Sequence, residues 1–388
     1  MTFDRAEYQA RLQRTRDQMR ARGIDTLIVT DPANMHYLTG YDGWSFYTPQ
    51  GVVVPYEGDL LLFTRAMDTG GARLTTWLED RQILGFPEDH VQQRDRHPLQ
   101  WVAAELVTRD LVGGVLALEM DSYYFSPRAY EALRGSLPGA RVVDAEELVN
   151  WVRAVKSPAE LEMMRRAARI MERVMRVGID AIEPGVRQSD AVAAIVAAQV
   201  RGTEDHGGDY PAIVPMLPTG IGTSTPHLTW SDERFRRDEA TILELAACCR
   251  RYHCPLARTV YLGAPPRKLV ETARVVEEGL EAALSAVRPS ATCEQVEAAW
   301  REVIARRGLE KSSRIGYSVG LGYPPDWGEH TMSLRAGDQT LLEPNMAFHM
   351  ILGIWMEDWG YGLSETFRVT EGGAECFCAF PRELTVKR

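Results

Sequence analysis

The stretch RAVKSPAELEMMRRAARIMERVMRVGIDAI, residues 153–182, limits most strongly how this chain can fold. Ser157 and Glu160 have the spacing of a capping box, and Pro158 suits the first position of a helix. A long helix is therefore predicted from residue 158 to about 182. The pattern of the chain differs on its two sides, and 388 residues are long for one core. We therefore expect two domains, residues 1–153 and 154–388.

The region before this helix alternates between strands and helices. Apolar runs typical of strands occupy residues 25–31, 51–55, 59–65, 114–120 and 141–145. Helical patterns lie near residues 98–109 and 127–135. Such alternation predicts an α/β layer domain.

The region after the boundary groups its helices and strands differently. Helices are predicted at about 158–182, 187–201, 266–286 and 294–307. Strands are predicted in ILELAAC, ARTVYLG, GYSVGLG, MAFHMILGIWM and LSETFRVT. Helices and strands each occur together, so the expected class is α+β with a mostly antiparallel sheet.

Charge and composition exclude several classes of protein. A net charge of −10 argues against nucleic-acid binding, which needs a basic face. No run approaches the roughly 18 apolar residues of a membrane span, and the charged N-terminus does not resemble a secretory signal. The six cysteines form no CxxC pair and are expected to be reduced thiols. We expect a cytoplasmic protein that binds neither nucleic acid nor membrane.

His227, in PTGIGTSTPHLTW, is a candidate for proton transfer. It follows a loop of small and polar residues, which can present a side chain to a ligand. Histidine is the side chain best suited to acid–base chemistry near neutral pH. The alternative is a histidine hydrogen-bonded within its own loop.

Two glutamates occur inside apolar strands. Glu244, in TILELAACC, alternates with Ile242 and Ala246, so its burial is plausible, and Glu365 occupies a similar position in YGLSETFRVT. Two carboxylates in one site would bind a cationic amidine or guanidine. The alternative is two unrelated surface acids.

Two further segments are candidates for the walls of a binding site. GYSVGLGYPPDWGEHTMSLR, residues 316–335, is rich in glycine and aromatic residues and offers the candidate ligand contacts Tyr317, Trp327, His330 and Arg335. The planar guanidinium of Arg335 would suit a carboxylate. GYDGWSFYTPQ, residues 40–50, concentrates aromatic side chains that either pack in a core or cover a site for a small cation: Trp44, Phe46 and Tyr47.

Several of these segments occur in the order found in a known family. RAVKSPAEL, PHLTW, ARTVYLG, GYSVGLG and SETFRVTEGG resemble the pita-bread hydrolases, which include creatinase, prolidase and aminopeptidase P. The resemblance covers nearly the whole chain. It implies an N-terminal creatinase-like α/β domain and a C-terminal pita-bread domain. It also implies a homodimer in which an N-terminal loop of one subunit helps to close the partner's site.

The metal ligands of that family are largely missing here. By resemblance, the two aspartates fall on Glu244 and Pro255, the histidine on Tyr317 and the first glutamate near Ile351, whereas the last glutamate is kept as Glu365. Proline and isoleucine have no side-chain donor, so a two-metal site cannot be assembled from these positions. We expect neither a metal nor another cofactor.

Longer segments indicate a particular activity. HYLTGYDGWSFYTPQ, GDYPAIVPMLPTG, RRYHCPLARTVYLG and GYPPDWGEHTMSLR resemble the branch of the family that hydrolyses ectoine, a cyclic amidine with a carboxylate. This likeness implies metal-independent opening of ectoine to N-acetyl-2,4-diaminobutyrate, with 5-hydroxyectoine as a further possible substrate. His227 matches the histidine that serves as acid and base in creatinase.

The same likeness suggests roles for the candidate residues. Glu365 and Glu244 would bind the amidinium, and Glu244 could instead attack its carbon. Arg335 or Arg258 would bind the carboxylate, and the aromatic loop 40–50 would cover the site.

Three other functions fit parts of the sequence. A creatinase-like enzyme acting on a guanidino acid would use the same carboxylates and histidine. A non-catalytic pita-bread scaffold that binds proteins belongs to a different class, but such a scaffold would not need His227 or Glu365. A metal-dependent Xaa-Pro peptidase is disfavoured by Pro255, Tyr317 and Ile351.

Overall fold

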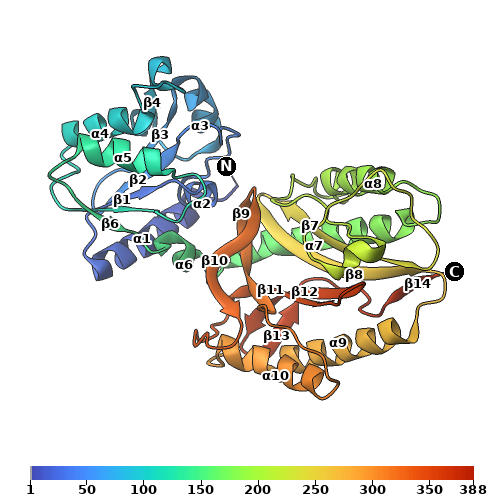
Figure 1. Cartoon of the computed structure of the whole chain (residues 1–388). Coiled ribbons are helices and arrows are strands. Elements are labelled where there is room, and N and C mark those ends of the chain that lie inside the picture. Colours follow the sequence, from blue (N-terminus) through green and yellow to red (C-terminus); the bar gives the residue numbers. More distant parts are fainter. Residues whose placement is uncertain (1) are drawn as a thin grey trace. The chain divides into compact units, whose positions relative to one another are not determined.

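A computed structural model describes residues 2–388 of the chain (Figure 1). The chain divides into two compact units, Met1–Arg153 and Ala154–Arg388. No helix formed by the described residues is long and apolar enough to cross a membrane.

The first unit is built on a six-stranded mixed sheet in the order β4-β3-β2-β1-β5-β6. Its strands are β1 (Thr26–Val29), β2 (Gly51–Pro55), β3 (Leu61–Arg65), β4 (Ile83–Phe86), β5 (Val115–Leu118) and β6 (Arg141–Asp144). Its helices are α1 (Arg5–Arg22), α2 (Pro32–Thr39), α3 (Thr69–Thr75), α4 (Pro98–Thr108), α5 (Pro127–Ser136) and α6 (Leu148–Arg153). Apolar side chains of α4 and α5 pack on the sheet. The α/β architecture predicted for this region is confirmed.

The second unit begins with the predicted long helix. Helix α7 (Pro158–Ala181) starts at a capping box, in which Ser157 Oγ accepts from the Glu160 amide and Glu160 Oε2 accepts from the Ser157 amide. The other helices are α8 (Gln188–Arg201), the 3₁₀ helix η4 (Gly220–Ser224), α9 (Arg267–Ala286) and α10 (Cys293–Ala305).

A mostly antiparallel sheet forms the centre of this unit. Its main path is β13-β12-β11-β9-β8-β14, with β7 paired to β8 and β10 to β9. The strands are β7 (Glu239–Cys249), β8 (Tyr252–Leu262), β9 (Gly316–Tyr323), β10 (Asp326–Leu334), β11 (Ala347–Trp355), β12 (Gly360–Thr370), β13 (Gly373–Cys376) and β14 (Thr385–Lys387). Only β14 runs parallel to its neighbour, so the predicted α+β class is confirmed.

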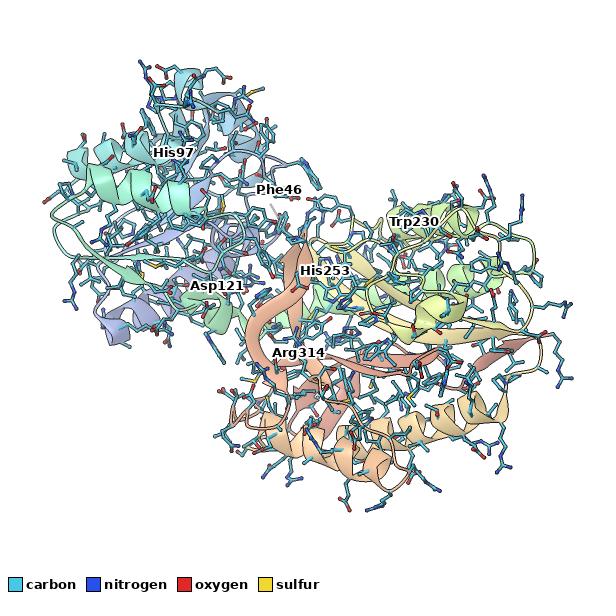
Figure 2. The ribbon with its side chains drawn as sticks, viewed as in Figure 1. Phe46, His97, Asp121, Trp230, His253 and Arg314 are labelled. Atoms are coloured by element: carbon cyan, nitrogen blue, oxygen red, sulfur yellow. The ribbon has the colours of Figure 1, made fainter. Side chains whose placement is uncertain are left out.

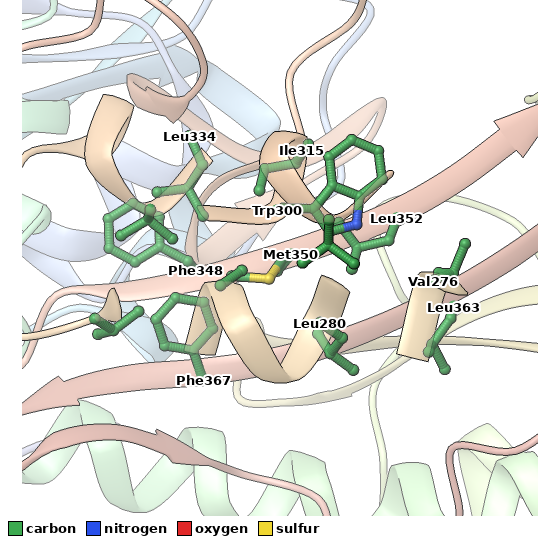
Figure 3. Packing of buried hydrophobic residues seen from close by; sticks show 14 of the residues in the cluster. Val276, Leu280, Trp300, Ile315, Leu334, Phe348, Met350, Leu352, Leu363 and Phe367 are labelled. Carbon is green, nitrogen blue, oxygen red and sulfur yellow. The ribbon is translucent and has the colours of Figure 1, made fainter. Parts of the chain in front are cut away.

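The helices cover one face of the strands and leave the other face for polar groups. Apolar residues of α9 and α10 pack against Met350, Leu352, Leu363 and Phe367 of β11 and β12 (Figure 3). Leu245 of β7 lies beside Gly178 of α7. Because side chains alternate along a strand, Glu244, Ile351 and Ser364 point away from these helices. We call this second face of β7, β8, β9, β11 and β12 the inner face.

Candidate active site

Glu244 is a single acidic group on the inner face of β7. Its side chain is partly exposed, and it has no hydrogen bond or ion pair with any described residue. Burial raises the pKa of this carboxyl to about 7, and the positive charge of Lys311 acts in the opposite direction. A carboxyl with this pKa exchanges protons near neutral pH, as a catalytic base must.

Glu365 does not join Glu244, which corrects the expected cation site. In the β11–β12 ladder Ile351 pairs with Ser364, whereas Glu365 pairs with Met350 on the helix-covered face. Glu365 is buried there and accepts from Arg258 Nη2 at 2.7 Å and from Arg382 Nε at 3.2 Å. The side chain facing Ile351 on the inner face is therefore a serine.

The guanidinium of Arg258 bonds to other groups of the protein. It is therefore not available for a substrate carboxylate, contrary to the expectation from the sequence. It lies beside Leu243 in the β7–β8 ladder, on the face opposite Glu244. Besides Glu365, its Nη1 donates to the carbonyl oxygens of Ala257 at 2.8 Å and Ser364 at 2.6 Å. The Arg258–Glu365 pair is 1% exposed on both sides and joins β8 to β12 behind the inner face.

A chain of neutral polar groups crosses the inner face. Trp327 Nε1 donates to Tyr317 Oη at 2.8 Å, and this hydroxyl lies 3.0 Å from His349 Nδ1. His349 Nε2 lies 2.8 Å from Ser364 Oγ, which also accepts from the Ala257 amide at 2.6 Å. A His349 tautomer protonated at Nε2 satisfies both of its contacts. The chain holds Tyr317 and Ser364 in fixed positions.

The histidine and tyrosine of this chain stay uncharged in the neutral pH range. Burial, with the nearby Arg314, lowers the pKa of His349 to about 3. Burial and the negative charge of Glu244 raise the pKa of Tyr317 far above its ordinary value. Glu244 therefore adjoins a neutral polar surface, with Tyr317 partly exposed and Trp327 fully buried behind it. Trp327 positions Tyr317 and has no exposed surface for a ligand.

The remaining candidates belong to β10, to the segment just after it and to the first unit. His330 lies at the surface with its Nε2 3.0 Å from Asp326, and Arg335 is exposed just beyond the end of β10. Trp44, Phe46 and Tyr47 belong to the first unit, where Trp44 and Tyr47 are exposed and Phe46 packs on Trp44. Their place over a site in the second unit stays a prediction.

His227 is exposed in the loop after η4 and has a left-handed backbone with φ of 67°. The loop is anchored near the start of β12, because Thr223 Oγ1 accepts from the Gly360 amide at 3.0 Å. Its later part, including Trp230 (Figure 2), lines a surface cavity of about 470 Å³. The structure shows no contact between His227 and Glu244, so the role of this histidine stays a prediction.

Reasoning from the sequence did not identify four residues that lie on the inner face or next to it: His349, Ser364, Lys311 and Arg314. The alternation argument used for Glu244 also applies to His349, which lies within the apolar strand MAFHMILGIWM. Arg314, which precedes β9 (Figure 2), lies with its guanidinium 4.5 Å from the centre of the Tyr317 ring. No sequence signal marks Lys311 or Ser364, because their neighbours come from strands distant in the sequence.

The donors on the inner face do not fit a two-metal centre. Of the five positions expected to match metal ligands, Glu244, Pro255, Tyr317 and Ile351 lie on the inner face and Glu365 lies on the other, so the inner face receives one carboxylate from this set. Among residues 2–388, no three histidine, cysteine, aspartate or glutamate side chains are grouped as metal ligands. Hydrolytic metal pairs are bridged and surrounded by several carboxylate and imidazole donors.

Comparison with known proteins covers both units. Residues 11–155 match the creatinase/prolidase N-terminal domain, and residues 162–371 match metallopeptidase family M24. An ectoine hydrolase from Halomonas elongata is 44% identical over 100% of this chain and 99% of its own. An uncharacterised hydrolase/peptidase from Sinorhizobium fredii is 43% identical over 99% and 98%. The solved prolidase from Thermococcus sibiricus, 17% identical, superposes with a TM-score of 0.85 over 98% of this chain and 99% of its own.

Proposed function

The chain belongs to metallopeptidase family M24 and carries a creatinase/prolidase N-terminal domain, and from this premise we propose that it is a metal-independent hydrolase that opens the ring of ectoine or 5-hydroxyectoine. The observation that carries the proposal is Glu244, an acid without a partner on a face that otherwise offers neutral groups. The full-length likeness to an ectoine hydrolase supports the choice of substrate.

The proposed reaction adds one water to the amidine. A new bond forms between oxygen and the amidine carbon, the bond from that carbon to one ring nitrogen breaks, and this nitrogen leaves as an amine after gaining a proton. The product, N-acetyl-2,4-diaminobutyrate, contains every atom of ectoine and of one water.

Glu244 suits this reaction in its ionised form. A cationic amidinium next to the carboxylate lowers the pKa of Glu244 again, so substrate binding favours the reactive state. The carboxylate either removes a proton from the attacking water or attacks the amidine carbon itself. Both routes need the negative charge, and Glu365 takes part in neither because it lies on the other face.

We retain His227 as the proposed donor of a proton to the departing nitrogen. His227→Ala should lower kcat by about 10²- to 10⁴-fold, the usual contribution of a general acid or base. Because the side chain is exposed, thermal unfolding should be unchanged. Steady-state kinetics and a melting curve measure both effects, and full activity of the variant would remove His227 from the mechanism.

The substrate is tested by incubating the purified protein with ectoine and following the mass of the products. We expect a species heavier by one water, no such species with Glu244→Gln, and unchanged activity with the exposed control Glu310→Gln. Parallel reactions with creatine and with Xaa-Pro dipeptides, with and without divalent metals, cover the rival functions. Turnover of a rival substrate alone would contradict the proposal.

The assembly belongs to the same proposal. We expect a cytoplasmic homodimer in which the aromatic loop 40–50 of one protomer covers the site of the other. Sedimentation velocity should show the mass of two chains, and a monomer at the concentrations used for kinetics would contradict this arrangement.

A further inference from the structure

Lys311, in the segment between α10 and β9, places a positive charge beside the inner face. Its ammonium donates to the carbonyl oxygen of Gly353 at 3.0 Å and lies 4.1 Å from the centre of the Trp355 ring. Gly353 has no side chain to hinder this, and a Cβ there would lie 2.1 Å from the same ring. The ammonium has three donors, and only one has an acceptor among the described residues.

Lys311 contacts β11 at a point that strand pairing and packing link to Glu244. Gly353, which holds the lysine, pairs with Gly362 of β12, and Gly362 packs against Ile242 of β7. Glu244 follows Ile242 by two residues and therefore points to the same face. Each charge affects the other: Lys311 lowers the pKa of Glu244, and Glu244 raises that of Lys311 against the effect of burial. No ion pair joins the two side chains among the described residues.

We propose that Lys311 binds the carboxylate of the substrate while Glu244 faces its cationic amidine, so that the site selects zwitterions. This inference rests on the proposed function and extends it to the substrate class: an amidinium or guanidinium compound that carries a carboxylate. Two opposite charges that are held apart, each short of hydrogen-bond partners, are both satisfied by a ligand with the complementary pair.

The other cations near the sheet fit this role less well. Arg258 is fully engaged behind the inner face, and Arg335 is exposed beyond β10. Arg314 stacks on Tyr317 and donates to Ser333 Oγ at 3.1 Å. Of these cations, Lys311 is the one whose positive charge lowers the pKa of Glu244.

The test compares ectoine with 2-methyl-1,4,5,6-tetrahydropyrimidine, which has the same amidine ring without the carboxylate. Lys311→Met should lower kcat/KM for ectoine by about 10- to 100-fold, the usual effect of removing a charged hydrogen bond. In the same variant, kcat/KM for the ring without the carboxylate should change by less than about threefold. Lys311→Gln, which keeps a donor to Gly353, should show the same loss of selectivity if Lys311→Met does not fold.

The matched control is Lys268→Met. Lys268 also lies over a tryptophan, 5.0 Å from the centre of the Trp359 ring, but it is exposed and paired with Asp358. Lys268→Met should leave the preference for ectoine over the ring without the carboxylate unchanged. A lysine that only ties its segment to β11 would predict equal losses for both compounds, and this result would overturn the inference. Loss of the preference in Arg314→Met but not in Lys311→Met would overturn it too.

The experiment also distinguishes failure of the proposed function from failure of the inference about Lys311. If the unmodified protein hydrolyses neither compound, the proposed function is wrong, and calorimetric dissociation constants for the same two compounds then replace kcat/KM. Weaker binding of ectoine alone in Lys311→Met would still support the zwitterion site. Absence of binding of both compounds by the unmodified protein would reject the inference together with the function.

Discussion

At the scale of single residues, the protonation of Glu244 connects stability with activity. Its pKa is raised from 4.5 in an ordinary environment to about 7 in the folded protein, because burial disfavours the charge. The folded state therefore binds more protons than the unfolded state between these two values. The free energy of unfolding should fall as pH rises from about 4.5 to 7 and change no further through this group above pH 7.

Glu244→Gln removes this penalty. We expect the variant to match the parent at pH 4 and to be more stable at pH 8, by about 1–3 kcal/mol when the partial exposure of the side chain is allowed for. Urea unfolding at both pH values measures the difference, with Glu310→Gln as the exposed control. A variant that is less stable than its parent at pH 8 would contradict the assigned environment.

Glu365 provides a second test at the same scale. Glu365→Gln leaves the buried Arg258 without its ionic partner and should cost about 3–5 kcal/mol of stability. The variant that remains folded at low temperature should keep its kcat, because Glu365 faces away from Glu244. Unfolding curves and kinetics on the folded fraction test both expectations. A Glu365→Gln variant with normal stability and no activity would show that Glu365 belongs to the active site.

At the scale of secondary-structure elements, strand alternation decides which residues meet. Ser364 and Glu365 are neighbours in the sequence, yet the side chain of Ser364 contacts His349 and that of Glu365 contacts Arg258. A shift of one residue in matching the strand therefore exchanges the two faces. Matching by motif placed the glutamate in the site, whereas pairing with Ile351 of β11 places the serine there.

The start of α7 was predictable because its signal is local. Ser157→Ala removes the side chain that accepts from the Glu160 amide, and it should destabilise the second unit by about 1 kcal/mol. Ser157→Asp should restore most of this loss, because aspartate is also a good N-cap residue. Chemical denaturation of the three proteins makes the comparison, and an unchanged midpoint for Ser157→Ala would show that the cap contributes nothing.

At the scale of the whole molecule, a metallopeptidase fold holds a site with few metal donors. Exhaustive dialysis against a chelator should leave the rate of ectoine hydrolysis unchanged, because the proposed chemistry uses Glu244 and water. Elemental analysis before and after dialysis shows how much metal was present. A loss of activity that the addition of one divalent metal restores would contradict the metal-free mechanism.

Local patterns in the sequence determined much of this molecule. Capping residues, apolar periodicity and the grouping of strands predicted α7, the α/β first unit and the antiparallel second unit, since each depends on neighbouring residues. The same reasoning identified Glu244 as an acid in an apolar strand. Motifs spread along the chain identified the family, which the full-length similarities confirm.

Only the tertiary structure decided which side chains meet. The pairing of β11 with β12 brought Ser364 to the inner face and turned Glu365 towards Arg258. The approach of the segment before β9 to Gly353 put Lys311 near Glu244. The contacts of Ser364 with His349, of Lys311 with Gly353 and of Glu365 with Arg258 join residues 15, 42 and 107 positions apart, separations over which periodicity and capping carry no information. Local sequence patterns therefore predicted the fold, whereas strand register and the packing of distant segments determined which charged side chains lie at the site.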